Sequence, residues 1–404
     1  MPVLKNISTL YTCRDEGVQS DIYPIQNGAI AWIGETIEWV GSESQLPEKF
    51  REEESFNAGG KMVIPGLVDC HTHLCFGGWR ADEFEMRIQG RSYLDIAKAG
   101  GGILSTVKAT RAASEDELYE KADELLKEVQ LQGVTAIECK SGYGLSLVDE
   151  LKQLRVYKRL REESDIHLVS TFLGAHTIPP EFNDNRKGYI DLVINEMIPA
   201  VAQENLAEFC DIFVEESAFT IDEARTIFEA GKKHGFTPKL HADQISSGGG
   251  AELAAEVGAV SADHLEQISD KGIKQMAEKH VVGVTLPLAS LYTQQPYLNC
   301  RKLVDGGVEV ALATDFNPGS APTFDLPLAM MLTCNHGRLT PAEVLKGATI
   351  YASKAINRGE QFGSIETGKS ADFLVIDAEN VNEWMYHYKG SRMESGFLKG
   401  KQIT

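Results

Sequence analysis

Short apolar runs alternate with amphipathic segments through the central part of the chain. Eight runs have the composition of buried strands: Met62–Leu67, Val134–Ile137, His167–Phe172, Asp211–Val214, Pro238–Leu240, Val260–Ala262, Val281–Leu286 and Val310–Ala313. Most are separated by segments whose apolar residues recur at helical spacing. Strands and helices that alternate eight times are typical of an α/β fold, the (β/α)8 TIM-like barrel. A doubly wound sheet is the structural alternative, but it rarely uses eight evenly recurring units.

Capping boxes mark three of the predicted helix starts. Ser114-Glu-Asp-Glu117 has a serine and a glutamate three residues apart, followed by apolar residues at helical spacing. Thr220-Ile-Asp-Glu223 repeats the box, and Thr340-Pro-Ala-Glu343 repeats it with proline at the first helical position. Gly133 stands where the C-cap of the first of these helices is expected.

Both ends of the chain have short, glycine-punctuated strand patterns. Gly28–Gly34 and Thr36–Gly41 are brief apolar or alternating runs, and Asp372–Asp377 is a similar run near the other terminus. We therefore predict that residues 1–61 and 358–404 form one small β-sandwich domain together. Residues 62–357 would form the barrel.

The charge balance narrows the function classes. Lysine and arginine number 39 against 59 aspartate and glutamate, which gives a net charge of −20 and a pI near 5.0. Such a chain lacks the basic footprint of a nucleic-acid-binding protein. No stretch approaches the roughly 18 uninterrupted apolar residues of a membrane helix, and the first residues do not have the pattern of a secretory signal. The 7 scattered cysteines are typical of reduced thiols, so we expect a cytoplasmic protein.

Histidines and acidic residues gather at the ends of the predicted strands. In a (β/α)8 barrel the catalytic groups follow the strands, because eight loops converge at that end. The candidate segments are Asp69-Cys-His71-Thr-His73, Gly174-Ala-His176, His241-Ala-Asp-Gln244, Asp263-His264 and Thr314-Asp315. We therefore expect the active site at this end of the barrel.

His71 and His73 are separated by one residue, so on a strand both imidazoles point to the same side. Two neutral imidazoles on one face can bind a divalent metal ion, with a further histidine and a carboxylate completing the ligand set. Together with His241 and Asp315 at later strand ends, the pair predicts a metal site. The alternative is a set of hydrogen-bonded histidines in a polar core, which leaves their concentration at strand ends unexplained.

We expect a single metal ion. A binuclear site of this kind needs a bridging anion, often a modified lysine after the fourth strand, and this chain has Val214-Glu-Glu-Ser217 there. Glu216 is a further possible ligand, although an ion pair or a solvated carboxylate is the simpler interpretation. The predicted ligands are His71, His73, His241 and Asp315. A water would take the open position; His264 would orient it or move its proton, and Asp315 would also act as a base.

Longer motifs resemble the amidohydrolase superfamily of metal-dependent hydrolases. Pro65-Gly-Leu-Val-Asp-Cys-His-Thr-His73 is similar to its strand-one motif, and Gly363-Ser-Ile-Glu-Thr-Gly-Lys-Ser-Ala-Asp372 to the segment that returns to its β domain. Within the superfamily, the resemblance is strongest to enzymes that hydrolyse a cyclic amide in histidine degradation. The segments that carry it are Phe76–Phe84, Gly100–Arg111, Lys140–Leu145 and Ala313–Ser320. The resemblance extends over essentially the whole chain.

The resemblance implies hydrolysis of the ring amide of 4-imidazolone-5-propanoate to N-formimidoyl-L-glutamate. It also implies one Zn²⁺ or iron ion on the four predicted ligands, and a homodimer. The implied substrate contacts are Arg80, Tyr143, His176, residue 244 (Gln244), Asn317, Gly319 and Ser320. The chemistry of Arg80 agrees, since a guanidinium on the first loop can grip the propionate carboxylate through two parallel hydrogen bonds.

Gln244 departs from the family pattern, in which many members have glutamate three residues after the strand-five histidine. An amide can bind the ring by hydrogen bonds, but it cannot carry a proton to a leaving nitrogen. His264 and Asp315 would then do the proton transfer. The departure counts against the alternative function, a mononuclear-metal deaminase of a heteroaromatic ring. A catalytically inactive scaffold is a third possibility, but such proteins usually lose metal ligands, and every predicted ligand is present here.

Overall fold

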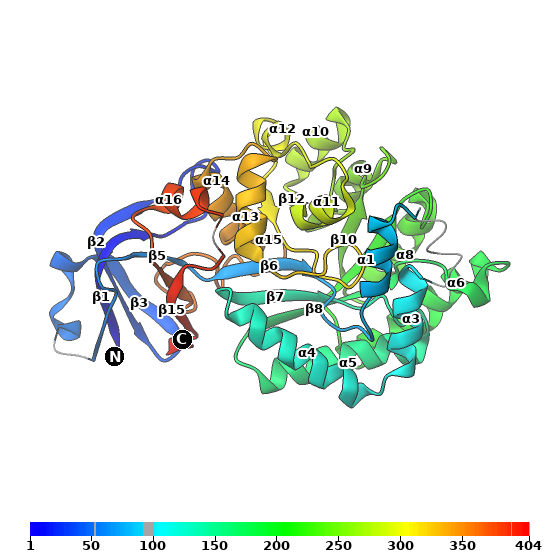
Figure 1. Cartoon of the computed structure of the whole chain (residues 1–404), viewed down its shortest axis with the longest axis horizontal. Helices are drawn as coiled ribbons and strands as arrows, with labels where there is room; N and C mark the ends of the chain where they lie inside the picture. Colours follow the sequence, from blue (N-terminus) through cyan, green and yellow to red (C-terminus); the bar gives the residue numbers. More distant parts are fainter. Residues whose placement is uncertain (52–53, 92–100, 389, 404) are drawn as a thin grey trace.

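Two eight-stranded sheets organise the computed structural model, which describes residues 1–51, 54–91, 101–388 and 390–403 (Figure 1). Gly100, in one of the motifs above, lies outside the described residues. The larger unit is a parallel sheet whose neighbouring strands follow one another in the sequence. Its strands are β6 (Leu67–Thr72), β7 (Val134–Lys140), β8 (His167–Ala175), β9 (Phe209–Val214), β10 (Thr237–Ala242), β11 (Ser261–His264), β12 (Val282–Thr285) and β13 (Val310–Leu312). This architecture confirms the predicted TIM-like barrel.

The barrel closes where β6 meets the residues that follow β13. Thr72 forms a parallel bridge with Phe316, and the backbone N–H of Asp315 donates to the carbonyl of His71 at 3.0 Å. Asp69 adds a side-chain link, since it accepts hydrogen bonds from the backbone N–H and the hydroxyl of Thr314 at 3.0 and 2.6 Å. The seam therefore fixes Asp315 beside the histidines of β6.

Helices cover the outside of the barrel. Their bounds are α1 (Ala81–Ile88), α3 (Ile103–Ala112), α4 (Glu115–Gln130), α5 (Leu147–Glu163), α6 (Arg186–Leu192), α7 (Ile198–Gln203), α8 (Ile221–Lys233), α9 (Gly250–Val257), α10 (Asp270–Lys279), α11 (Pro287–Thr293), α12 (Cys300–Asp305), α13 (Leu326–Asn335), α14 (Pro341–Gly347) and α15 (Ile350–Lys354). The three predicted capping boxes are confirmed at the starts of α4, α8 and α14, with both reciprocal hydrogen bonds present in each. Gly133 lies two residues beyond the C-cap of α4, with a positive φ of 90°.

The second sheet brings together both termini, beside the barrel in Figure 1. Its path runs β16 (Lys401–Gln402), β15 (Met393–Leu398), β14 (Phe373–Ile376), β5 (Met62–Pro65), β1 (Val3–Tyr11), β2 (Pro24–Ile33) and β3 (Thr36–Ser42), with β4 (Ser55–Asn57) paired to β1. One further helix, α16 (Val381–Tyr386), lies between β14 and β15 in the sequence. The separate sheet built from both ends agrees with the predicted fold class.

The prediction of a single barrel strand over Met62–Leu67 is wrong. Residues of β5 pair with β1 and β14 in the terminal sheet, and the barrel strand β6 begins only at Leu67. Gly66 separates the two strands, and a Cβ at Gly66 would lie 2.1 Å from the hydroxyl of Thr135. The apolar pattern continues through this point because both strands are fully buried.

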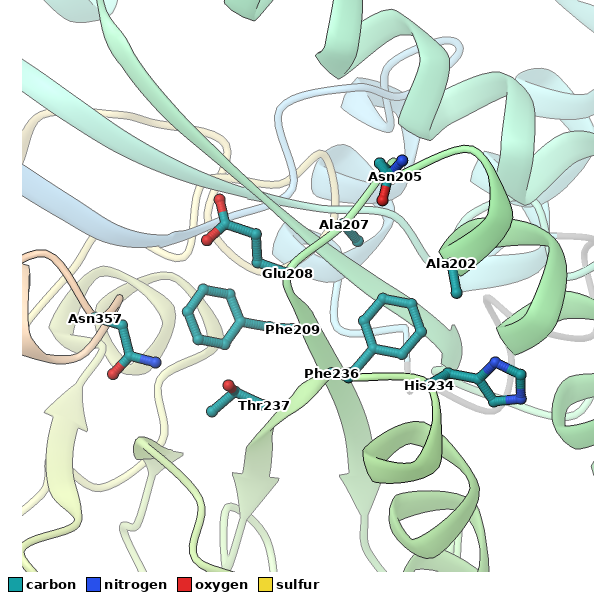
Figure 2. A pocket seen from close by; sticks show the side chains of 10 residues that line it. Ala202, Asn205, Ala207, Glu208, Phe209, His234, Phe236, Thr237 and Asn357 are labelled. Carbon is teal, nitrogen blue, oxygen red and sulfur yellow. The ribbon is translucent and has the colours of Figure 1, made fainter.

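A pocket of about 310 Å³ opens at the amino ends of β9 and β10, the end of these strands opposite to the predicted site. Figure 2 shows Phe209, Phe236 and Thr237 around it, with Asn357 nearby. Glu208 also lines this pocket, but its carboxylate is bound by Arg358 at 2.6 Å.

Among the described residues, no helix combines the length and the apolar character needed to cross a membrane.

We predict that Thr314→Val destabilises the fold by about 1–3 kcal/mol, because it leaves a buried oxygen of Asp69 and the N–H of Phe316 without their hydrogen-bond partner. Heat and urea unfolding followed by circular dichroism would measure the change. Thr226→Val is the control: that hydroxyl donates to Asp222 on the exposed face of α8, so little change is expected. Equal stability of Thr314→Val and the wild type would contradict the role given to the seam.

Candidate metal centre and active site

The carboxyl ends of five barrel strands bring the predicted histidines and Asp315 together. The ring centroids of His71 and His241 lie 4.5 Å apart, and those of His71 and His73 lie 5.5 Å apart. The ring of His264 lies 5.5 Å from that of His241. All of these side chains are buried. Strands far apart in the sequence therefore present one compact group of imidazoles.

Two overlapping sets of side chains have the spacing of metal ligands. One ligand atom each from His71, His73 and Asp315 lie within 4.8 Å of one another, and the same is true of His71, His241 and His264. An oxygen of Asp315 lies 3.3 Å from His71 Nε2 and 3.5 Å from His73 Nε2. Glu216, the alternative ligand, is exposed and belongs to neither set.

Carboxylates fix the orientation of two of these imidazoles from behind. His71 Nδ1 lies 2.6 Å from Asp263 Oδ2, and His241 Nδ1 lies 3.0 Å from Asp211 Oδ1. A carboxylate can only accept, so each ring donates from Nδ1. The two Nε2 atoms are buried and have no hydrogen-bond partner among the described residues. Histidines that ligate a metal commonly donate their second nitrogen to a carboxylate in this way, so the arrangement fits a divalent ion at Nε2.

A buried lysine joins these two carboxylates, and the sequence analysis missed it. Lys140 Nζ, at the end of β7, lies 2.8 Å from Asp211, 3.7 Å from Asp263 and 2.8 Å from Glu138, and all four side chains are fully buried. Burial alone would raise the pKa of Asp211, but His241 and Lys140 hold it well below its usual range. Asp211 and Asp263 are therefore ionised behind the imidazoles.

The protonation of the imidazoles follows from burial and from their acidic neighbours. Burial lowers the pKa of His73 to about 4 and that of His264 to about 3, so both rings are neutral near pH 7. Burial and Lys140 also lower the pKa of His71, but the hydrogen bond to Asp263 and the nearby Asp315 carboxylate outweigh them and raise it to about 9. Because a ligating imidazole must lose its proton, metal binding at His71 competes with protonation.

The backbone is unusual where the site residues leave their strands. His264, Leu265, Asp243 and Asp315 all have positive φ angles, of 78°, 69°, 48° and 56°. Non-glycine residues in this region are strained, and such residues concentrate at functional sites. Here the left-handed turns direct the chain sharply away from the strand ends.

Arg80 lies on the loop before α1, as predicted, but its guanidinium already has a partner. Nε and Nη2 donate to Glu83 Oε2 at 2.9 and 2.7 Å. A Cβ at Gly319 would lie 2.1 Å from Arg80 Nη1, so glycine is needed for this close approach. The structure therefore brings Arg80 and Gly319 together, and Glu83 fixes the orientation of the guanidinium.

Asn317 and Ser320 form much of the loop after Asp315. Asn317 Nδ2 donates to the Asp315 carbonyl at 2.6 Å, and Asn317 Oδ1 accepts from the backbone N–H groups of Gly319 and Ser320 at 2.8 Å. The Ser320 hydroxyl lies 3.4 Å from Asp315 Oδ2. The amide of Asn317 therefore shapes this loop.

Tyr143 and His176 line the side of the site next to His73. Their rings lie 5.7 and 5.4 Å from the His73 ring, and His176 Nδ1 is bound to the Gly142 carbonyl at 3.0 Å. Burial lowers the pKa of His176 well below its usual value and raises that of Tyr143. Both groups are therefore neutral hydrogen-bonding groups near pH 7.

Gln244 is half-buried in the loop after β10. This loop is anchored by Glu215, which accepts from the Ile245 N–H at 2.9 Å, and by Asp243, which accepts from three backbone N–H groups near the start of α9. Neither acidic residue was predicted to have this role. The sequence does not distinguish them from solvated carboxylates, because the partners of Glu215 lie on another loop and those of Asp243 are backbone groups.

The amidohydrolase family profile matches residues 62–403, which covers most of the chain. The chain belongs to the amidohydrolase family. The imidazolonepropionase of Geobacillus thermodenitrificans (strain NG80-2) is 51% identical over 390 residues, 95% of this chain and 92% of that protein. The imidazolonepropionase of Fusobacterium nucleatum subsp. nucleatum is 46% identical over 406 residues, 99% of this chain and 98% of that protein.

Solved structures share the fold at low sequence identity. An atrazine chlorohydrolase from Arthrobacter aurescens TC1, complexed with zinc, has a TM-score of 0.73 and 14% identity, and the match covers 100% of this chain and 95% of that one. A 5-methylcytosine deaminase from Klebsiella pneumoniae has a TM-score of 0.75 and 15% identity, and the match covers 100% and 97%. These likenesses support the architecture alone.

We predict that Asp263→Asn weakens zinc binding by about 10–100-fold, because the charged partner that orients His71 is lost. Competition with a chromophoric chelator would measure the affinity, and circular dichroism would check that the variant is folded. Asp270→Asn is the matched control on the exposed start of α10 and should bind zinc as the wild type does. Unchanged affinity of Asp263→Asn would contradict a metal site at His71.

Proposed function

We propose that this amidohydrolase hydrolyses the ring amide of 4-imidazolone-5-propanoate to N-formimidoyl-L-glutamate, the imidazolonepropionase reaction of histidine degradation. The observation that carries the proposal is the 51% identity to a curated imidazolonepropionase over nearly the full length of both chains. The enzyme class, a hydrolase acting on carbon–nitrogen bonds, follows from the same relatives and from the family. We also retain a cytoplasmic location and a homodimer as predictions.

The proposed metal ligands are His71, His73, His241 and Asp315, which would hold one Zn²⁺ or iron ion per chain. Unpartnered Nε2 atoms on His71 and His241, and the short approach of Asp315 to His71 and His73, support this set. Such an ion lowers the pKa of a coordinated water towards ~7, so that hydroxide is available at neutral pH. Zinc and iron accept the same nitrogen and oxygen ligands, so the ligand set leaves the choice between them open.

His264 and Asp315 are the proposed proton-transfer groups. His264 is neutral near pH 7, because burial lowers its pKa, so it can accept a proton from the attacking water. Asp315 is ionised: the nearby imidazoles of His71 and His73 outweigh burial and hold its pKa well below the usual value. Gln244 has no proton to give, so the proposed role for its amide is to bind the ring.

The remaining proposed contacts lie on two sides of the site, one for the propionate group of the substrate and one for its ring. Arg80, with Gly319 beside it, would bind the propionate carboxylate; Asn317 and Ser320 would form the wall next to it. Tyr143 and His176, both neutral, would hydrogen-bond to the ring or its oxygen. Glu83 takes the Nε hydrogen and one Nη2 hydrogen of Arg80, so Nη1 and the second Nη2 hydrogen are left to bind the substrate carboxylate in parallel when Glu83 stays bound.

The decisive experiment is hydrolysis of freshly prepared 4-imidazolone-5-propanoate by protein of known metal content, followed by ultraviolet absorbance. We expect loss of the ring chromophore with about one metal ion per chain, abolition by a chelator, and recovery with Zn²⁺ or iron. A metal-loaded protein that leaves the ring intact would contradict the proposal. Release of ammonia from purines or pyrimidines by that protein would instead favour a ring deaminase.

We predict that Arg80→Lys raises KM by at least about tenfold while the metal content stays unchanged, because an ammonium group cannot form two parallel hydrogen bonds to a carboxylate. Steady-state kinetics and metal analysis of the same preparation would test this. Arg91→Lys, a substitution in the exposed turn after α1, provides the control and should behave as the wild type. Parallel loss of metal and of substrate affinity in Arg80→Lys would exclude a carboxylate clamp.

A further inference from the structure

Glu266 is a buried acidic residue beside the active site to which the proposed mechanism gives no role. Its side chain is 5% exposed, and Oε2 has no hydrogen-bond partner among the described residues. Two residues earlier, His264 is 3% exposed, and its Nδ1 likewise lacks a partner. These two atoms lie 3.8 Å apart. Two unsatisfied buried polar atoms therefore face each other at slightly more than hydrogen-bond distance.

The backbone places Glu266 back against His264. Consecutive positive φ angles at His264 and Leu265 curl the chain as it leaves β11. The turn is held from β10 and its loop, since the Leu265 N–H donates to the Ala242 carbonyl at 3.0 Å and the Gln267 N–H donates to the Asp243 carbonyl at 2.8 Å. The strained turn therefore places the carboxyl group of Glu266 next to the imidazole of His264.

The same pairing occurs at two other histidines of the site. His71 is bound at Nδ1 by Asp263, and His241 is bound at Nδ1 by Asp211. Glu266 likewise faces Nδ1 of His264, but at 3.8 Å it lies slightly beyond hydrogen-bond distance. An oriented imidazole with a carboxylate at Nδ1 is also the arrangement that prepares a general base elsewhere, because it fixes the tautomer and stabilises the imidazolium.

We infer that Glu266 is a positioning residue for His264: Oε2 accepts the Nδ1 hydrogen, which leaves Nε2 without a hydrogen and able to accept a proton from water. The inference rests on the proposed hydrolysis for its kinetic consequences. The orientation of His264 is especially important in this chain because the amide of Gln244 cannot take part in the proton transfer. No co-reactant is needed, since one proton moves from water to Nε2 and later to the leaving nitrogen.

Kinetics of Glu266→Leu would test the inference. We expect kcat to fall about 10–100-fold, while KM stays within about twofold and the metal content is unchanged. Glu266→Gln keeps an acceptor oxygen and should recover part of the loss. Glu252→Gln is the matched control, since Glu252 on α9 also has a buried, unpartnered Oε2 but lies outside the site. A loss of metal, or a change in KM alone, would overturn the inference.

A double substitution distinguishes a positioning role from a structural one. If Glu266 acts through His264, adding Glu266→Leu to His264→Ala should change kcat by no more than about twofold. Multiplicative losses in the double variant would contradict the inference.

Nitrogen-15 NMR of histidine-labelled, zinc-loaded protein would identify the tautomer of His264 without a measurement of catalytic activity. The His264 signals, assigned by their loss in His264→Ala, should show a protonated Nδ1 in the wild type and a changed tautomer in Glu266→Leu. A wild-type His264 protonated at Nε2 would overturn the inference whether or not the protein hydrolyses imidazolonepropionate. Absence of wild-type turnover with the expected tautomer would contradict the proposed function and leave the pairing intact.

Discussion

The candidate site depends on a cluster of buried charged side chains that lies directly behind the histidines. Asp211 and Asp263 are fully buried and ionised beside the equally buried Glu138, and ionised carboxylates in such a place require a cation and hydrogen bonds. Lys140 supplies the shared cation from β7, while Lys239 approaches Asp263 to 4.0 Å from β10. Removal of one partner would leave a buried charge uncompensated. The parallel barrel makes this cluster possible, because neighbouring strands place side chains from remote sequence segments at one depth.

The cluster determines where the imidazoles point. Asp211 binds Lys140 through Oδ2 and accepts the Nδ1 hydrogen of His241 through Oδ1. Asp263 uses one oxygen, Oδ2, which faces Lys140 and Lys239 and accepts the Nδ1 hydrogen of His71. The opposite nitrogen, Nε2, of each ring is then directed away from the cluster, and at His71 it must lose its proton before a metal ion can bind. Closure of the barrel adds the last element, since the seam between β6 and the residues after β13 places Asp315 against His71 and His73. The geometry of the candidate ligands is thus built by backbone pairing and buried charge together.

The sequence predicted the elements of the site more completely than the interactions behind them. The strand-end rule found every histidine that converges here, because their places after apolar runs are local features. The rule did not find Lys140, since Glu138 and Lys140 interrupt the apolar pattern of the second strand, and their partners are remote in sequence. The prediction of a single barrel strand over Met62–Leu67 was wrong for a related reason. Apolar composition predicts burial, but it does not specify the sheet in which a strand pairs. Glu266, two residues after a candidate histidine, could have been considered as an acidic residue at a strand end.

With glutamine instead of glutamate at position 244, the proposed proton transfer depends on other groups. The loop that carries it keeps its anchors, since Glu215 and Asp243 bind backbone N–H groups around it. The amide can still donate to and accept from a ring, but proton transfer must use groups with a titratable nitrogen or oxygen. Near the candidate metal ligands, His264 is a neutral imidazole, and burial raises the pKa of Glu266 to about 8, so this carboxyl group is mostly protonated near pH 7 and accepts the Nδ1 hydrogen of His264 through its unprotonated oxygen. A site without an acid at position 244 therefore has a neutral imidazole and a carboxyl group close together at the end of the neighbouring strand.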